Sequence, residues 1–196
     1  MGLIFFENIS AENYTFFDCR NAEAFCNGHF KNSIFVGNDE GREERLAIME
    51  PLPKNACFII SDIESSSSLL KKTMVQSNSF LTWNSDMKIS VPGFDLSIAI
   101  DLQEFLLDYK YDEFFLIDVR AANDFAKGSI EHAQSIPAED LMQTIFDLDS
   151  NKPYYIFGSN FEEALFATSI FKQNGFNLVR VVSCSYDEIA KQLKKK

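Results

Sequence analysis

The chain has 196 residues, 46% of them hydrophobic, and a formal net charge of -11 at pH 7. Such an acidic surface offers no cationic patch that could release counterions from phosphates, which argues against nucleic-acid binding. No apolar run approaches the roughly 20 residues needed to cross a bilayer, so we expect a cytoplasmic protein with no membrane partner. The four cysteines form no C-x-x-C pair and the two histidines lie far apart, so we expect reduced thiols, no metal site and no cofactor.

The first part of the chain predicts strands and helices in alternation. Apolar residues before Asp18 predict a strand, and Gly41–Met49 predicts a helix. Ala56–Ile60 has the apolar composition of a buried strand, and Ser65–Val75 predicts the helix that follows it. A Pro-Gly pair then breaks both kinds of regular structure, so we place a linker at residues 89–93.

The second part of the chain continues the alternation. Apolar residues at helical spacing predict a helix over Ile98–Leu107, and Phe114–Ile117 predicts a buried strand. Strands alternating with helices imply a parallel sheet covered on both faces, which is an α/β fold. The remaining expected elements are two strands and four helices: strands Tyr154–Phe157 and Leu178–Val182, and helices Ala121–Lys127, Pro137–Phe146, Ser159 or Asn160 to Gln173, and Tyr186–Lys196.

A short motif occurs twice, at a constant offset of 100 positions. Each copy has an apolar strand, then Asp-x-Arg, then a phenylalanine five residues after the arginine and a glycine three residues further on. This self-similarity indicates one unit that has been duplicated. The identical residues are Asp18 and Asp118, Arg20 and Arg120, Ala22 and Ala122, Phe25 and Phe125, and Gly28 and Gly128.

This motif resembles that of the rhodanese (sulfurtransferase) family. The second copy is similar to the family module nearly from end to end, and the first copy is similar but looser. The resemblance implies two rhodanese-like modules, at residues 1–88 and 94–196, each with a small, mostly parallel sheet flanked by helices on both faces. We expect two carboxylate-guanidinium pairs, Asp18 with Arg20 and Asp118 with Arg120, to fix the strand-to-helix turns, which is a structural role.

In the family that this chain resembles, the strand after the Asp-x-Arg unit ends in a catalytic cysteine. Backbone amides at the start of the next helix then cradle the bound sulfur and the anionic donor. In the second module the cysteine position falls on Gly158, and a position that is often arginine falls on Glu163. Carboxylates at that helix start would oppose both a thiolate and an anionic substrate. This degenerate loop consists of Gly158, Ser159, Asn160, Phe161, Glu162 and Glu163.

The corresponding loop of the first module lacks the cysteine as well. The cysteine position falls at Ser61, in a register uncertain by about one residue, and the later basic position falls at Ser66. No histidine or lysine is placed by sequence to activate a serine, so we do not expect a serine hydrolase. The acids Asp62 and Glu64 could together attract a cation, although no further ligand spacing supports a metal site.

Three of the four cysteines, Cys19, Cys26 and Cys57, are expected to be structural. Cys184 follows the last strand, on the side where the sheet presents its ligand loops, and is the candidate redox thiol. We expect a tandem protein without sulfurtransferase chemistry that binds or regulates an unidentified protein partner. The alternative is an enzyme, a sulfurtransferase that uses Cys184 or another thiol, or one completed by a partner chain. The sequence does not predict the oligomeric state.

Overall fold

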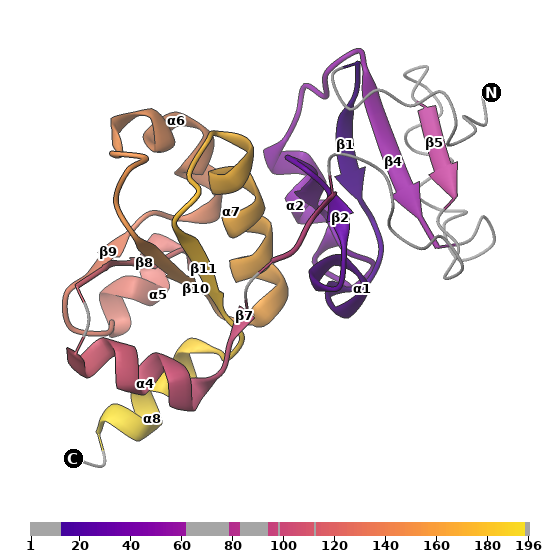
Figure 1. The fold of residues 1–196 in the computed structure, drawn as a ribbon. Coiled ribbons are helices and arrows are strands. Elements are labelled where there is room, and N and C mark those ends of the chain that lie inside the picture. The colour runs from indigo at the N-terminus through magenta and orange to yellow at the C-terminus, as the bar shows by residue number, and fades with distance from the viewer. Residues whose placement is uncertain (1–12, 62–78, 83–93, 98, 112, 195–196) are drawn as a thin grey trace. The chain divides into compact units, whose positions relative to one another are not determined.

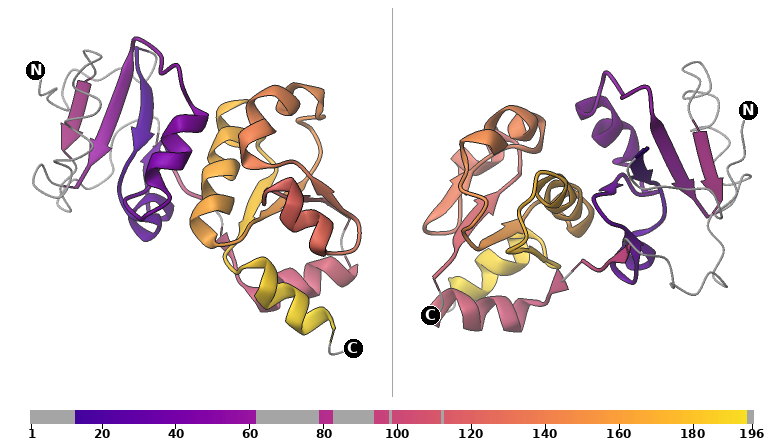
Figure 2. Two further views of the ribbon diagram at one scale, coloured as in Figure 1. Left: turned by 180° about the vertical axis from the view of Figure 1, so that it is seen from behind. Right: turned by 45° about the horizontal axis from the view of Figure 1, so that its top comes forward.

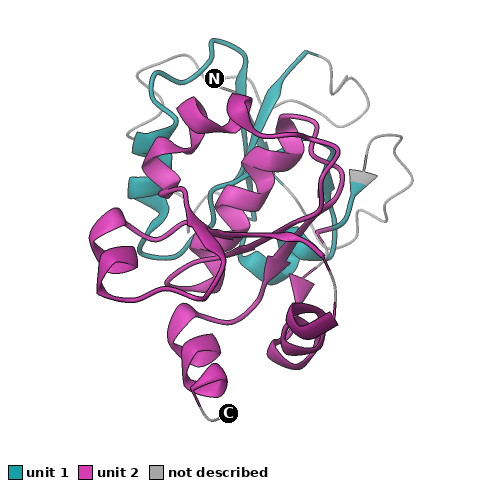
Figure 3. Ribbon diagram, turned by 90° about the vertical axis from the view of Figure 1, so that its left-hand side faces the viewer, with its two compact units in different colours: residues 1–96 teal, residues 97–196 magenta. Residues whose placement is uncertain are grey.

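The computed structural model describes residues 13–61, 79–82, 94–97, 99–111 and 113–194. The chain divides into two compact units, residues 1–96 and 97–196 (Figure 3). The linker expected at residues 89–93 lies outside the described residues, as does the helix expected at Ser65–Val75. Strand β6 (Phe94–Asp95), which the sequence placed in the second module, pairs antiparallel with β2 (His29–Phe30) and belongs to the first unit.

The second unit is built on a five-stranded sheet in the order β7-β11-β10-β8-β9, and all of its pairings are parallel (Figure 1). Parallel strands present all their carboxyl ends at one edge of the sheet, which is where ligand sites form in open α/β sheets. The strands are β7 (Ala99–Ile100), β8 (Phe115–Asp118), β9 (Ala133–Ser135), β10 (Tyr154–Phe157) and β11 (Val179–Val182).

Helices cover both faces of this sheet, as the alternating pattern predicts. Helix α7 packs against β10 and β11 on one face, whereas α4 and α8 share an apolar cluster with the opposite face (Figure 1). Figure 2 shows the same layers from behind. The helices are α4 (Leu102–Tyr111), α5 (Ala122–Lys127), α6 (Leu141–Thr144), α7 (Phe161–Gln173) and α8 (Tyr186–Leu193).

Two of the expected helices of the second unit differ from the structure. The helix expected over Ile98–Leu107 was wrong at its start, because Ala99–Ile100 forms β7 beside β11. Helix α4 begins only after Asp101. The Asp101 carboxylate caps the helix by accepting hydrogen bonds from the backbone amides of Gln103 and Glu104, at 2.8 and 2.9 Å. The helix expected over Pro137–Phe146 is instead the short α6 between two 3₁₀ turns.

The first unit repeats the parallel arrangement with four strands in the order β3-β1-β4-β5. Rings of Phe17, Phe58 and Phe80 stack across three adjacent strands, with centroids 5.4 and 5.6 Å apart. Its elements are β1 (Thr15–Asp18), α1 (Ala22–Cys26), β3 (Ile34–Phe35), α2 (Arg42–Ile48), β4 (Ala56–Ile60) and β5 (Ser79–Thr82). In neither unit does the described part of the chain include a helix long and apolar enough to span a membrane.

Candidate functional site

The turn from β8 to α5 is fixed by a buried ion pair. Arg120 Nε donates to both carboxylate oxygens of Asp118, at 2.9 and 3.1 Å, and Nη2 donates to Asp118 Oδ2 at 2.6 Å. The same Nη2 also donates to the carbonyl of Gly128, at 2.8 Å. Since both side chains are buried, this bidentate pair holds the guanidinium in one orientation at the carboxyl edge of the sheet.

The first unit contains the same arrangement at the end of β1. Arg20 contacts Asp18 at 2.9, 3.1 and 2.6 Å, and its Nη2 donates to the carbonyl of Gly28 at 2.7 Å. The two pairs expected from the repeated motif are therefore present, with nearly identical distances. Each pair links the end of a strand to a glycine eight residues beyond the arginine.

The loop that follows β10 is filled by the carboxylate of Glu163. Glu163 Oε2 accepts a hydrogen bond of 2.6 Å from the backbone amide of Ser159. The side chain of Asn160 caps α7 by accepting from the amide of Glu163, at 2.8 Å. A β-carbon placed on Gly158 would lie 2.7 Å from Glu163 Oε2, which is closer than real β-carbons approach. A side chain at position 158 and the Glu163 carboxylate therefore compete for the same space.

The surroundings of Glu163 disfavour its charge. Burial raises the pKa of its carboxyl above the ordinary glutamate range, and the nearby charge of Asp118 raises it further. Hydrogen bonds from Ser159 and the charge of Arg120 act in the opposite direction without cancelling the effect of burial. The loop thus holds a partly desolvated carboxylate where the resembled family holds an anionic sulfur group.

In the first unit, the position equivalent to Gly158 is Ile60. The sequence predicted this position at Ser61, which is one residue further on. Backbone pairing fixes this register, because Cys19 donates to the carbonyl of Ile59 just as Val119 donates to that of Phe157. Ile60 is 1% exposed, and its side chain has no nucleophilic atom. The other residues expected in this loop, Asp62, Glu64 and Ser66, lie outside the described residues.

Three of the cysteines, Cys19, Cys57 and Cys184, are buried thiols. Burial raises the pKa of Cys184 to about 11, with a further contribution from the charge of Glu188, and burial alone raises that of Cys57 to about 12. The pKa of Cys19 is also far above its usual range, chiefly because the thiol is buried. Since the thiolate is the reactive form, these three thiols are poor nucleophiles at neutral pH. Cys184 belongs to the apolar cluster beneath α8.

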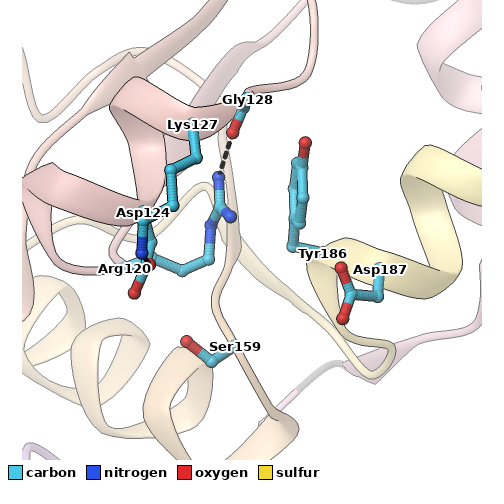
Figure 4. A pocket seen from close by; sticks show the side chains of 7 residues that line it. All are labelled: Arg120, Asp124, Lys127, Gly128, Ser159, Tyr186 and Asp187. Atoms are coloured by element: carbon cyan, nitrogen blue, oxygen red, sulfur yellow. Dashed lines mark hydrogen bonds and ion pairs between the residues drawn. The ribbon is translucent and has the colours of Figure 1, made fainter.

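A pocket of about 320 Å³ opens at the carboxyl edge of the second sheet (Figure 4). The Tyr186 ring lies over the Arg120 guanidinium, with 3.5 Å between Cζ and the ring centroid. The amide of Tyr186 donates to the carbonyl of Gly158 at 3.0 Å, which joins the start of α8 to the Glu163 loop. The lining residues are Arg120, Asp124, Lys127, Gly128, Ser159, Tyr186 and Asp187.

The sequence predicted that Ser159 belongs to the loop at this edge and that Arg120 has a structural role in the turn. It did not predict Arg120, Tyr186 or Lys127 as pocket residues. One signal for Tyr186 was available, since it follows the helix-capping Ser185 directly after the last strand, where a parallel sheet presents its ligand loops. Among the residues that the structure describes, no group of three acidic, histidine or cysteine side chains could hold a metal ion.

Residues 99–192 match the family model described as the rhodanese-like domain. No curated protein matches the chain. Similar solved structures include a Staphylococcus saprophyticus protein, 24% identical with a TM-score of 0.44, for which the match covers 47% of this chain and 92% of that one. The rhodanese-like domain of an Anabaena protein is 20% identical, with a TM-score of 0.45 and coverage of 50% and 76%. A human single-domain sulfurtransferase is 22% identical, with a TM-score of 0.43 and coverage of 51% and 98%.

The second unit is therefore a rhodanese-like domain. The first unit has a parallel sheet and the same Asp-x-Arg turn, which suggests a second module of this kind.

Proposed function

We infer that this chain is a tandem rhodanese-like protein that does not transfer sulfur and acts as a binding or regulatory unit for a protein partner in the cytoplasm. One observation carries this inference: the loop amide of Ser159 binds the carboxylate of Glu163, beside a glycine at the position where the family carries its sulfur. A sulfur carrier needs a thiolate at that position and a cradle open to an anionic donor. The second unit offers neither of these.

The first unit supports the same inference from a different residue. Its equivalent position is the buried Ile60, whose side chain carries no nucleophilic atom. Losing the sulfur carrier in both modules leaves the fold without the group that defines sulfurtransferase chemistry. Function follows the site rather than the fold, and here the site favours binding.

The alternative function is sulfur transfer through Cys184. Its position favours this alternative, because Cys184 comes only two residues before Tyr186, which lines the pocket. Its surroundings oppose it, since the thiol is 8% exposed and its pKa is raised to about 11. A persulfide-forming cysteine requires an accessible thiolate.

Sulfur loading distinguishes the two functions. The full chain is incubated with thiosulfate, and its intact mass is measured alongside that of the Cys184→Ala variant. We expect neither protein to gain the mass of a sulfur atom. A gain in the unmodified chain that is absent from the Cys184→Ala variant would establish the alternative.

A further inference from the structure

The pocket of the second unit presents hydrogen-bond donors that the described residues leave without acceptors. Arg120 uses Nε and Nη2 on Asp118 and Gly128, whereas its Nη1 donates to no acceptor within the described chain. Figure 4 shows this third nitrogen directed toward the space beside Tyr186. The Tyr186 hydroxyl also has no hydrogen-bond partner among the described residues. Arg120 is only 5% exposed as a residue, but it lines the pocket, so its free donor is reached from there.

These donors are held in place before any ligand arrives. Four hydrogen bonds to Asp118 and Gly128 fix the guanidinium, and the Tyr186 ring covers its face at 3.5 Å. The absence of a side chain at Gly128 makes room for Tyr186, since a β-carbon there would lie 2.7 Å from the hydroxyl. A ligand that accepts from these donors therefore loses little free energy to ordering of the protein.

The charges around the pocket disfavour a ligand with two negative charges. The charge of Arg120 is balanced by Asp118, and the exposed Lys127 pairs with Asp124 at 2.7 Å. Asp187 adds a carboxylate to the lining. A dianion such as thiosulfate would meet these carboxylates with few uncompensated cations, whereas the free donors still require an oxygen acceptor. The volume of about 320 Å³ is at the small end for ligand pockets.

We propose that this pocket binds a small organic monocarboxylate, whose oxygens accept hydrogen bonds from Arg120 Nη1 and the Tyr186 hydroxyl while Lys127 faces it at the rim. The proposal rests on the proposed function, because it names a ligand for a unit that binds without transferring sulfur. The ligand lies beside Ser159, whose backbone amide already binds the Glu163 carboxylate.

Benzoate is a suitable probe, with benzamide as its uncharged analogue and thiosulfate as the dianion. The ¹⁵N-labelled full chain is titrated with each compound, and the Arg120 Nε–H signal is followed by NMR. We expect saturable binding of benzoate with a dissociation constant on the order of a millimolar. Benzamide and thiosulfate should bind at least about tenfold more weakly, because one lacks the charge and the other carries too much of it.

Two variants test the assigned contacts. Tyr186→Phe keeps the ring over Arg120 but removes the hydroxyl, and we expect it to weaken benzoate binding about five- to tenfold. Lys127→Met should weaken it about two- to fivefold. Lys152 is exposed and lines a different pocket, so Lys152→Met is the matched control. This variant should bind benzoate like the unmodified chain.

The proposal is wrong if benzoate does not saturate, if benzamide binds equally well, or if Tyr186→Phe leaves the affinity unchanged. None of these outcomes alters the inference that sulfur is not transferred. Conversely, thiocyanate formation from thiosulfate and cyanide would overturn the proposed function whatever benzoate does.

Discussion

Glu163 and Gly158 together determine what the loop after β10 can do. The glycine leaves room for the carboxylate, and the carboxylate occupies the amide that an external anion would use. Because Glu163 is anchored on the first turn of α7, the contact forms within a single loop and costs little chain entropy. The two residues therefore form one unit, and a change at one of them alters the effect of a change at the other.

A double-mutant cycle measures this coupling. Gly158→Cys should lower the free energy of unfolding by about 1 to 3 kcal/mol, because the new side chain displaces the Glu163 carboxylate from the Ser159 amide. In a Glu163→Ala background the same substitution should cost less than about 0.5 kcal/mol, since the space is then empty. Urea denaturation followed by circular dichroism gives the four values. Strictly additive effects would show that the two side chains do not compete.

The candidate site was only partly predictable at the residue scale. The sequence shows that position 158 is a glycine and that Glu163 is acidic, because these follow from alignment with a known motif. It does not show that Glu163 turns back onto Ser159, since a side-chain rotamer depends on the local backbone and on neighbouring elements. The stacking of Tyr186 on Arg120 joins residues 66 positions apart and was missed for the same reason.

Helix α8 is the element that brings Tyr186 into the pocket, and a capping box fixes where it begins. Ser185 receives a hydrogen bond from the amide of Glu188 at 3.4 Å, and the Glu188 carboxylate accepts from the amide and hydroxyl of Ser185, both at 2.8 Å. These bonds hold the pKa of Glu188 below its usual range. The first turn of the helix, with Tyr186 at its start, is thereby held against the carbonyl of Gly158.

Substitution of the cap tests this role. Ser185→Ala should lower the free energy of unfolding by about 1 kcal/mol at neutral pH. Because the pKa of Glu188 is lowered in the folded state, its contact stabilises the protein at pH values above the ordinary pKa of a glutamate. This stabilisation is lost as the pH falls through the lowered pKa. The difference between the variant and the unmodified chain should therefore shrink in acid. Denaturation at several pH values measures it, and a constant difference would exclude the Glu188 contact as its cause.

Ser150→Ala is the control for this measurement. Ser150 is exposed and makes no side-chain hydrogen bond within the described chain, so its substitution should change the free energy of unfolding by less than about 0.5 kcal/mol.

Long and strongly apolar elements were predictable, whereas short ones were not. The strands Ala56–Ile60 and Tyr154–Phe157 were confirmed at both ends, because continuous apolar runs bounded by polar residues mark a buried strand. Strands of two or three residues, such as β7 and β9, contain too few positions to show a period. Only pairing with neighbours defines them, and this pairing is a tertiary property.

The two units share one order of parallel strands. The order β3-β1-β4-β5 in the first unit corresponds to β9-β8-β10-β11 in the second, and the second adds β7 beyond β11. The register between β1 and β3 is the same as that between β8 and β9. Asp18 pairs with Phe35 and Asp118 pairs with Ser135, so both positions differ by the 100 residues that separate the two motifs. The sequence predicted a duplication from five identities, and the buried pairs Asp18–Arg20 and Asp118–Arg120 have the same spacing in both units.

The proposed absence of sulfur transfer is tested most directly by one measurement on the whole chain. Thiocyanate production is followed while the 196-residue chain is supplied with thiosulfate and cyanide. We expect a rate indistinguishable from that of the same mixture without protein. Sustained thiocyanate formation that is proportional to protein concentration and abolished by Cys184→Ala would contradict it.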